Sequence, residues 1–203
     1  MFEFNACSPS AKRIGLALVA ATLPMQAWAH SAADGHSDVV HGMLHPVAGL
    51  DHLLVMVGVG LFAATLGGKA RWLLPTTFVS VMALASVAAM SGLIGGSPAE
   101  HLIALSVLAI GLPIALALKP TLPSAMTLVA LCAALHGHAH GVELPTAAGA
   151  AAFLVGFVTS TALLHATGAL AGVALARLSV TGFSLVRSAG VAMALAGVVL
   201  LQS

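Results

Sequence analysis

Histidine is the residue type in this sequence with the greatest capacity for chemistry. The 203 residues include ten histidines, beside only seven lysines and arginines and six aspartates and glutamates. A neutral imidazole is a good ligand for divalent first-row metals. Several of these histidines lie inside apolar stretches, where a solubilising role does not explain them. Two clusters combine histidines with a carboxylate, and they define the candidate chemistry.

The first cluster contains His45, Asp51 and His52 at the start of an apolar stretch. Pro46 suits the first turn of a helix, which would place His45 at its entrance. If that helix included both histidines, they would lie about 20° apart around its axis. A carboxylate within a membrane span costs about 2.5–3.5 kcal/mol on insertion scales and needs a partner or a cation. Asp51 therefore either belongs to a cation site or hydrogen-bonds a neighbouring helix.

The second cluster is the sequence LHGHAHGVE at residues 135–143. On a helix, His136, His140 and Glu143 fall within about 60° of one another. His138 points to roughly the opposite side. Two imidazoles and a carboxylate on one face are a credible site for a divalent first-row metal. Two alternatives stay open: the glycines could make the segment a loop with flexible ligands, or it could be a polar helix end at the membrane interface.

The amino-terminal residues carry the three parts of a secretory signal peptide. Lys12 and Arg13 precede an apolar run at residues 14–23, and Ala27-Trp28-Ala29 supplies small residues at the expected cleavage positions. We expect residues 1–29 to be removed; an uncleaved anchor is the alternative. His30 would then begin the mature chain, where its amine and imidazole either chelate a metal ion together or belong to a disordered polar leader.

The composition is typical of a polytopic membrane protein. Hydrophobic residues make up 60% of the chain and charged residues 6%, against about 25% charged residues in soluble domains. Mean hydropathy is +1.07. This composition excludes a soluble enzyme. Removal of the signal leaves five basic and five acidic residues, which provide no surface for nucleic acid. The sequence has no phosphate-binding GxxxxGK[ST] stretch, so an ATP-driven pump in one chain is also excluded.

The apolar runs predict an all-α fold of six membrane-spanning helices in residues 47–203, after a histidine-containing periplasmic leader at residues 30–46. The expected spans are residues 47–66, 72–94, 100–118, 124–141, 147–174 and 182–201. The basic residues of the mature chain all fall on the side that is then cytoplasmic; they are Lys69, Arg71, Lys119, Arg177 and Arg187. We expect a multi-pass protein of the bacterial inner membrane with both mature termini in the periplasm.

Three segments resemble the HupE/UreJ family of nickel permeases. They are HPVAGLDHLLVMVGVG at residues 45–60, LHGHAHGVE at residues 135–143 and TALLHATGALAG at residues 161–172. Family members have an H-x5-D-H motif in the first span and an [F]-H-G-x-[AV]-H-G-x-E motif in the fourth. The sequence departs from these only at Leu135, where Phe is usual. The resemblance implies a metal path that contains His45, Asp51, His52, His136, His140 and Glu143.

The roles of three further residues near this path stay open. His165 matches the third segment, where it either ligates a metal or faces a helix partner. Glu100 and His101 either extend the path from the third span or lie at the membrane interface.

The resemblance implies a permease, not an enzyme, that imports Ni²⁺ into the cytoplasm for nickel enzymes such as hydrogenase or urease. Co²⁺ is the nearest alternative cargo, because the same ligands hardly separate adjacent metals. No permanent cofactor is expected, and the partners are the transported ion and the lipid bilayer. The rival function is a di-haem electron-transfer membrane protein with His136 and His165 as axial ligands, which leaves Asp51 and Glu143 unexplained.

Overall fold

The computed structural model describes residues 39–96, 100–143 and 149–202, apart from the side chains of Glu143 and Ser179. In this part of the chain the protein has seven α-helices and no strand, which confirms the expected all-α class. The helices are α2 Val39–Ala48, α3 Leu50–Leu66, α4 Ala70–Met90, α5 Glu100–Ala115, α6 Leu122–Glu143, α7 Ala150–Ala176 and α8 Ser179–Leu200. The signal peptide predicted at residues 1–29 lies outside the described residues, as does His30.

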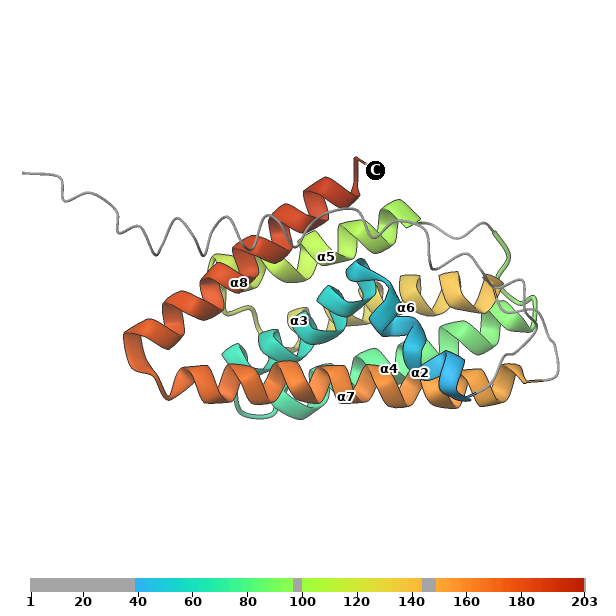
Figure 1. Cartoon of the computed structure of the whole chain (residues 1–203), viewed down its shortest axis with the longest axis horizontal. Coiled ribbons are helices and arrows are strands. Elements are labelled where there is room, and N and C mark those ends of the chain that lie inside the picture. Colours follow the sequence, from blue (N-terminus) through green and yellow to red (C-terminus); the bar gives the residue numbers. More distant parts are fainter. Residues whose placement is uncertain (1–38, 97–99, 144–148, 203) are drawn as a thin grey trace, which may run out of the picture. The chain divides into compact units, whose positions relative to one another are not determined.

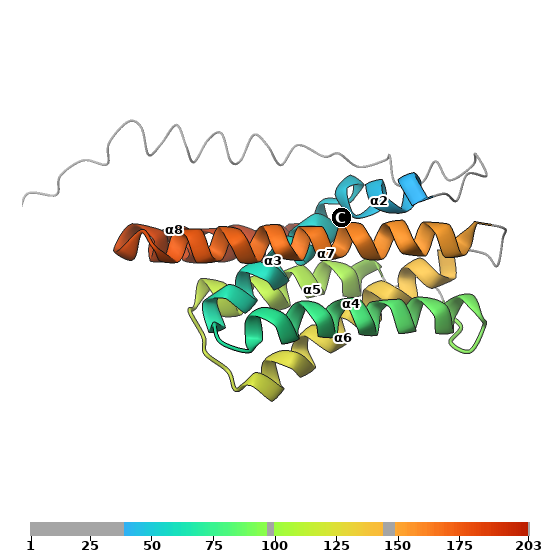
Figure 2. The ribbon, with the colours of Figure 1, turned by 90° about the horizontal axis from the view of Figure 1, so that it is seen from below.

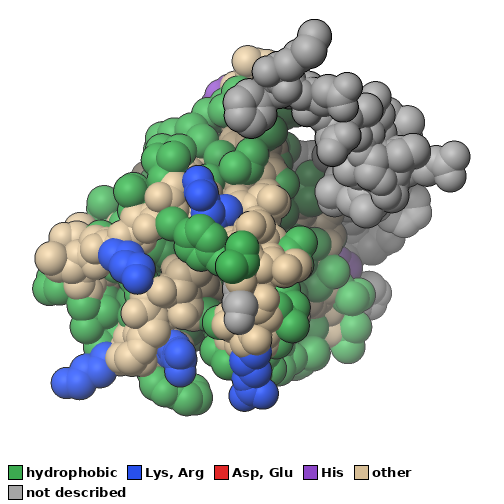
Figure 3. Space-filling model, turned by 90° about the vertical axis from the view of Figure 1, so that its left-hand side faces the viewer, with side chains coloured by type: hydrophobic (Ala, Val, Ile, Leu, Met, Phe, Trp, Pro, Cys, Tyr) green, Lys and Arg blue, Asp and Glu red, His purple; other side chains and the backbone are tan. Residues whose placement is uncertain are grey.

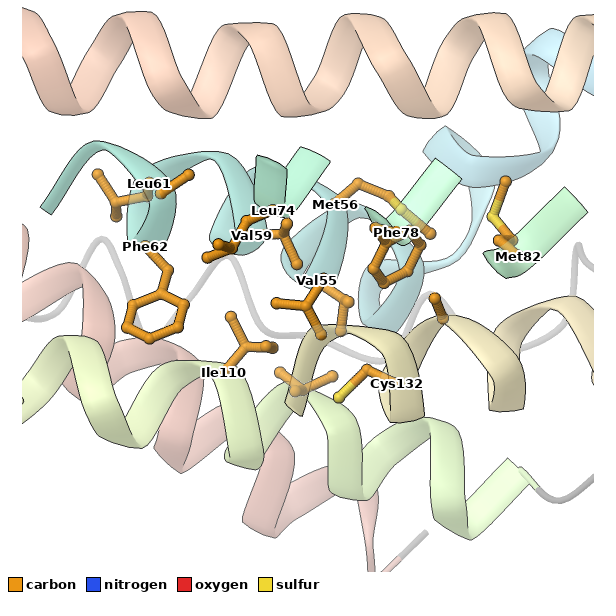
Figure 4. Packing of buried hydrophobic residues seen from close by; sticks show 14 of the residues in the cluster. Val55, Met56, Val59, Leu61, Phe62, Leu74, Phe78, Met82, Ile110 and Cys132 are labelled. Atoms are coloured by element: carbon orange, nitrogen blue, oxygen red, sulfur yellow. The ribbon is translucent and has the colours of Figure 1, made fainter. Parts of the chain in front are cut away.

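The helices pack mainly in pairs, with α3 at the centre. α4 lies along α6, α5 lies along α8, and both α2 and α3 pack against α7 (Figures 1 and 2). α3 also contacts α4, α5 and α8. Its fully buried Val55 and Phe62 point toward Ile110 of α5 (Figure 4). Because α3 touches so many neighbours, it fixes where the polar residues at its amino-terminal end lie.

Close contact between α3 and α7 depends on glycine. A Cβ atom added at Gly60 would collide with the carbonyl oxygen of His165, and one at Gly168 would collide with that of Val57. Small residues allow such close approach of helix backbones in membrane proteins. The contact therefore holds His165 of α7 directly beside the middle of α3.

Within the described residues, four helices are long and apolar enough to cross a membrane: α4, α6, α7 and α8. α2 and α3 pass the same test together, but the pair is bent by 87° and would count as one broken span. α5 has 16 residues, about 24 Å of helix, which is shorter than the hydrocarbon core of about 30 Å. The multi-pass character of the chain is supported, and the number of six spans stays a prediction.

The chain bends where the sequence suggested one continuous helix. Pro46 lies in the last turn of α2 and not in the first turn of α3, and Gly49 interrupts the helix with an extended backbone, φ −97° and ψ 126°. A Cβ atom on Gly49 would lie 2.8 Å from the Asp51 carboxylate and 2.9 Å from the His52 ring. Residues 39–46, expected in the leader, are thus helical, and the relation of His45 to His52 does not follow helical periodicity.

The basic side chains of the described residues gather at one end of the bundle (Figure 3). Lys69, Lys119 and Arg177 lie in the connections after α3, α5 and α7, and Arg71 lies in the first turn of α4. Arg187, in α8, donates a hydrogen bond through its Nε to the Ala115 carbonyl at the end of α5, at 2.9 Å. The grouping agrees with the alternation that the sequence predicts.

Candidate metal site

Three histidines from three helices meet at the amino-terminal end of α3. His45 belongs to α2, His52 to α3 and His140 to α6. His140 Nε2 lies 2.7 Å from His52 Nε2, and His140 Nδ1 lies 3.1 Å from His45 Nε2. One ring nitrogen from each residue falls within 4.8 Å of the others. We call His45, His52 and His140 the three-histidine cluster.

Asp51 fixes the orientation of His52. Its Oδ1 accepts hydrogen bonds from the backbone N–H of His52 at 2.8 Å and from His52 Nδ1 at 2.7 Å. Because the carboxylate accepts at Nδ1, the Nε2 of a neutral His52 is the nitrogen with a free lone pair, and it is this atom that faces His140. A carboxylate that holds the second nitrogen of a histidine is a common arrangement around metal-binding imidazoles.

The cluster has an apolar aromatic side and a more open side. Phe157 of α7 packs its ring 4.6 Å from the ring of His140 and 5.9 Å from that of His45. His140 is 3% exposed, whereas the side chains of His52 and Asp51 are 12% and 27% exposed. The more exposed side of the cluster is therefore that of Asp51 and His52, and His140 lies deeper in the protein.

The histidines of α6 are arranged as the predicted helical face requires. His136 and His140 are buried at 0% and 3% exposure. The intervening His138 points elsewhere, with its Nε2 3.3 Å from the Gly95 carbonyl oxygen. The helix continues through Gly137 and Gly141 to Glu143, so no loop forms around the histidines. The side chain of Glu143 lies outside what the structure describes.

His136 lies beside the cluster but makes a different contact. Its ring centroid is 5.2 Å from that of His52, and its Nδ1 donates to the Cys132 carbonyl oxygen at 2.8 Å. His165 is buried on α7 and donates through Nδ1 to the Met56 carbonyl oxygen at 2.6 Å. Glu100 and His101 are exposed in the first turn of α5.

Two features of the site were not predicted from the sequence. The α2 helix brings His45 to the cluster from a direction that helical periodicity did not predict, and Phe157 supplies the aromatic side. Phe153 and Phe157 stand four residues apart at the start of an apolar run. That spacing was the available signal, but it is equally typical of ordinary packing between helices.

The geometry suits a divalent cation. Metal–imidazole bonds of about 2.0–2.1 Å are typical of zinc sites, and neighbouring ligand atoms around one ion then lie about 3 Å apart. One ring nitrogen from each of the three histidines lies within 4.8 Å of the others, so a modest adjustment of the rings would bring three nitrogens to one ion. The ligands are nitrogens with a nearby carboxylate, a set that binds nickel, cobalt, copper and zinc.

Comparisons with known proteins give the family of the chain. The family model described as HupE / UreJ protein matches residues 17–200. Protein HupE of Rhizobium leguminosarum bv. viciae is 44% identical over 191 residues, which cover 93% of this chain and 97% of that protein. No solved structure matches the chain. The chain therefore belongs to the HupE/UreJ family, a transporter family associated with nickel and cobalt.

Proposed function

We propose that this protein is an inner-membrane permease that imports Ni²⁺ from the periplasm to the cytoplasm for nickel enzymes such as hydrogenase or urease. The observation that carries the proposal is the three-histidine cluster, in which ring nitrogens from α2, α3 and α6 converge within 4.8 Å. His45, His52 and His140 are the proposed ligands. Asp51 orients His52 and offsets the charge of the ion, and Glu143 and His30 complete the proposed path at its entrance.

The ligand chemistry favours transport over permanent binding. Imidazole nitrogens hold nickel less tightly than thiolates do, so the ion can leave toward the next position on its path. The same ligands also accept Co²⁺, which stays the nearest alternative cargo. The di-haem function has no support in the family match.

The proposed orientation follows from the basic end of the bundle. Positively charged connections are typical of the cytoplasmic side, and Lys69, Lys119 and Arg177 follow the carboxyl ends of α3, α5 and α7. The cluster lies at the opposite, amino-terminal end of α3 and would face the periplasm. Six spans then require that the short α5 also crosses the bilayer, with local thinning or flanking residues making up its length.

Reporter fusions test this orientation. A reporter that works only in the periplasm should be active when it is fused after Gln202. A reporter that works only in the cytoplasm should be active when it is inserted at Lys119. The physical reason is that basic connections resist translocation. Cytoplasmic activity of the fusion after Gln202 would contradict the proposed topology.

Metal uptake by cells that carry the protein tests the proposed function. We expect accumulation of radioactive Ni²⁺ above that of cells with an empty vector, with Co²⁺ competing more strongly than Zn²⁺ or Mn²⁺. The His140→Ala variant at equal membrane abundance is the matched control. Uptake of neither nickel nor cobalt above the empty vector would make the proposal wrong.

The Asp51→Asn variant separates charge from shape. Asparagine keeps an oxygen that accepts the His52 donors, but it carries no negative charge. We expect normal membrane insertion and a fall in uptake at low nickel concentration of about 10–100-fold, the usual cost of losing the partner of a metal-binding histidine. Unchanged uptake would show that Asp51 serves only in packing.

Two histidines of α6 distinguish ligand position from residue type. His140→Ala removes the ring whose Nε2 faces His52 and whose Nδ1 faces His45, and it should reduce uptake by about tenfold or more. His138→Ala, only two residues away, should transport near the wild-type rate because its ring contacts Gly95 outside the cluster. Uptake is compared at equal membrane abundance. If both variants lose transport equally, the assignment of ligands by helical face fails.

A further inference from the structure

Two buried histidines beyond the cluster each have an unused ring nitrogen. His136 and His165 are both 0% exposed. In the part of the chain that the structure describes, neither Nε2 atom has a hydrogen-bond partner. A buried polar atom without a partner is unfavourable, because it has lost its hydrogen bonds to water and gained none in return. Two such atoms, on rings that both contact Phe78, indicate that something absent from the protein itself satisfies them.

The two rings present the same chemical group. A carbonyl oxygen only accepts hydrogen bonds, so the Nδ1 of His136, at the Cys132 oxygen, carries the proton. The same holds for the Nδ1 of His165 at the Met56 oxygen. Each neutral ring therefore has an unprotonated Nε2 with a free lone pair. A backbone carbonyl that fixes one nitrogen while the other stays available is the usual arrangement of a metal-binding histidine.

The pair lies one helical turn deeper than the three-histidine cluster. On α6, His136 precedes His140 by four residues, and on α3 the Met56 carbonyl that holds His165 follows His52 by four residues. Both intervals correspond to about 6 Å along a helix. They lead from the cluster in the same direction, toward the basic end of the bundle.

Phe78 of α4 connects the two rings. Its ring centroid lies 5.6 Å from that of His136 and 4.9 Å from that of His165, and both contacts are edge-on. His136 in turn lies 5.2 Å from the ring of His52. The four rings thus form a continuous series from the cluster into the interior of the bundle.

We propose that His136 and His165, the buried histidine pair, form a second metal-binding position that receives the divalent ion from His52 of the three-histidine cluster. This inference rests on the proposed function and names the next step of the same path. The Nε2 atoms are the ligands, and water completes the shell of the ion. His165 is thereby a metal ligand, and the pair is a transfer position separate from the cluster.

The two positions hold an ion in turn. Two divalent cations about 6 Å apart repel one another strongly in a low-dielectric interior. Occupation of the cluster therefore favours departure from the buried pair, as between adjacent sites in ion channels. With only two imidazoles, the pair binds weakly enough to release the ion onward.

The His165→Asn variant tests the pair in transport. The asparagine amide can replace Nδ1 as donor to the Met56 oxygen, but it has no atom at the place of Nε2. We expect the maximal rate of Ni²⁺ uptake to fall about tenfold or more, while the nickel concentration for half-maximal uptake is unchanged because the cluster still loads. His165→Gln, which restores a polar atom near the place of Nε2, should recover part of the rate. His138→Asn is the matched control and should behave as wild type.

A purely structural role of His165 predicts the opposite order. His165→Asn would then transport like the wild type, because the hydrogen bond to Met56 is kept, and that result would overturn the proposal. His136→Asn gives a second, independent variant, since it keeps the donor to the Cys132 oxygen and removes Nε2. Both variants are compared at equal membrane abundance.

Nickel binding gives a readout that does not depend on transport. The purified full chain in lipid nanodiscs, with His45→Ala and His140→Ala to disable the cluster, is titrated with Ni²⁺ alone by equilibrium dialysis. Adding His165→Asn should remove about one bound ion per chain; equal binding with and without His165→Asn would overturn the inference.

The results also separate this inference from the proposed function. If wild type takes up nickel and His140→Ala does not, but His165→Asn matches wild type in uptake and binding, only this inference fails. If wild type transports neither nickel nor cobalt, the proposed function fails, and the binding comparison alone decides whether the pair holds a metal.

Discussion

Imidazoles buried in an apolar bundle need partners for their ring nitrogens, and this requirement determines the arrangement at the centre of the molecule. Water is scarce inside such a bundle, so each nitrogen must face a protein group or an ion. Asp51 satisfies one nitrogen of His52, and backbone carbonyls satisfy one each on His136 and His165. In the three-histidine cluster the remaining nitrogens lie at hydrogen-bond distance from one another, whereas the Nε2 atoms of His136 and His165 face no protein group among the described residues. The lone pairs of these two atoms are the feature that a cation complements.

The sequence predicted the helical class and the α6 face because both depend on local periodicity. Apolar runs identify helices whatever their neighbours, and a spacing of four residues places His136 and His140 on one side of a helix. The course of the backbone through the first cluster could not be predicted from periodicity. Pro46 is compatible with either end of a helix, and the extended backbone of Gly49 depends on how α2 packs against α7. His45 therefore reaches the cluster from α2, although His45 and His52 do not share one continuous helix.

The contacts of His165 could not be predicted from the sequence either. Its contact with Met56 joins residues 109 positions apart, and it exists because Gly60 and Gly168 let α3 and α7 approach closely. Glycine, alanine and leucine recur through much of α7, so no single glycine stood out as the contact point. The glycine contacts are thus as important for the candidate path as the histidines, since they decide which carbonyl oxygen holds the ring and where its free nitrogen points.

Cys132 is a potential metal ligand that lies next to the proposed path of the ion. The residue lies one turn before His136 and gives that histidine its carbonyl oxygen, while its side chain is buried in the apolar core (Figure 4). A thiolate in the series of imidazoles would bind nickel more tightly than the positions on either side and would slow its release. A sequence of similar, moderate sites lets an ion move with small steps in free energy. The exclusion of the one described thiol is therefore consistent with a path that passes an ion along and does not store it.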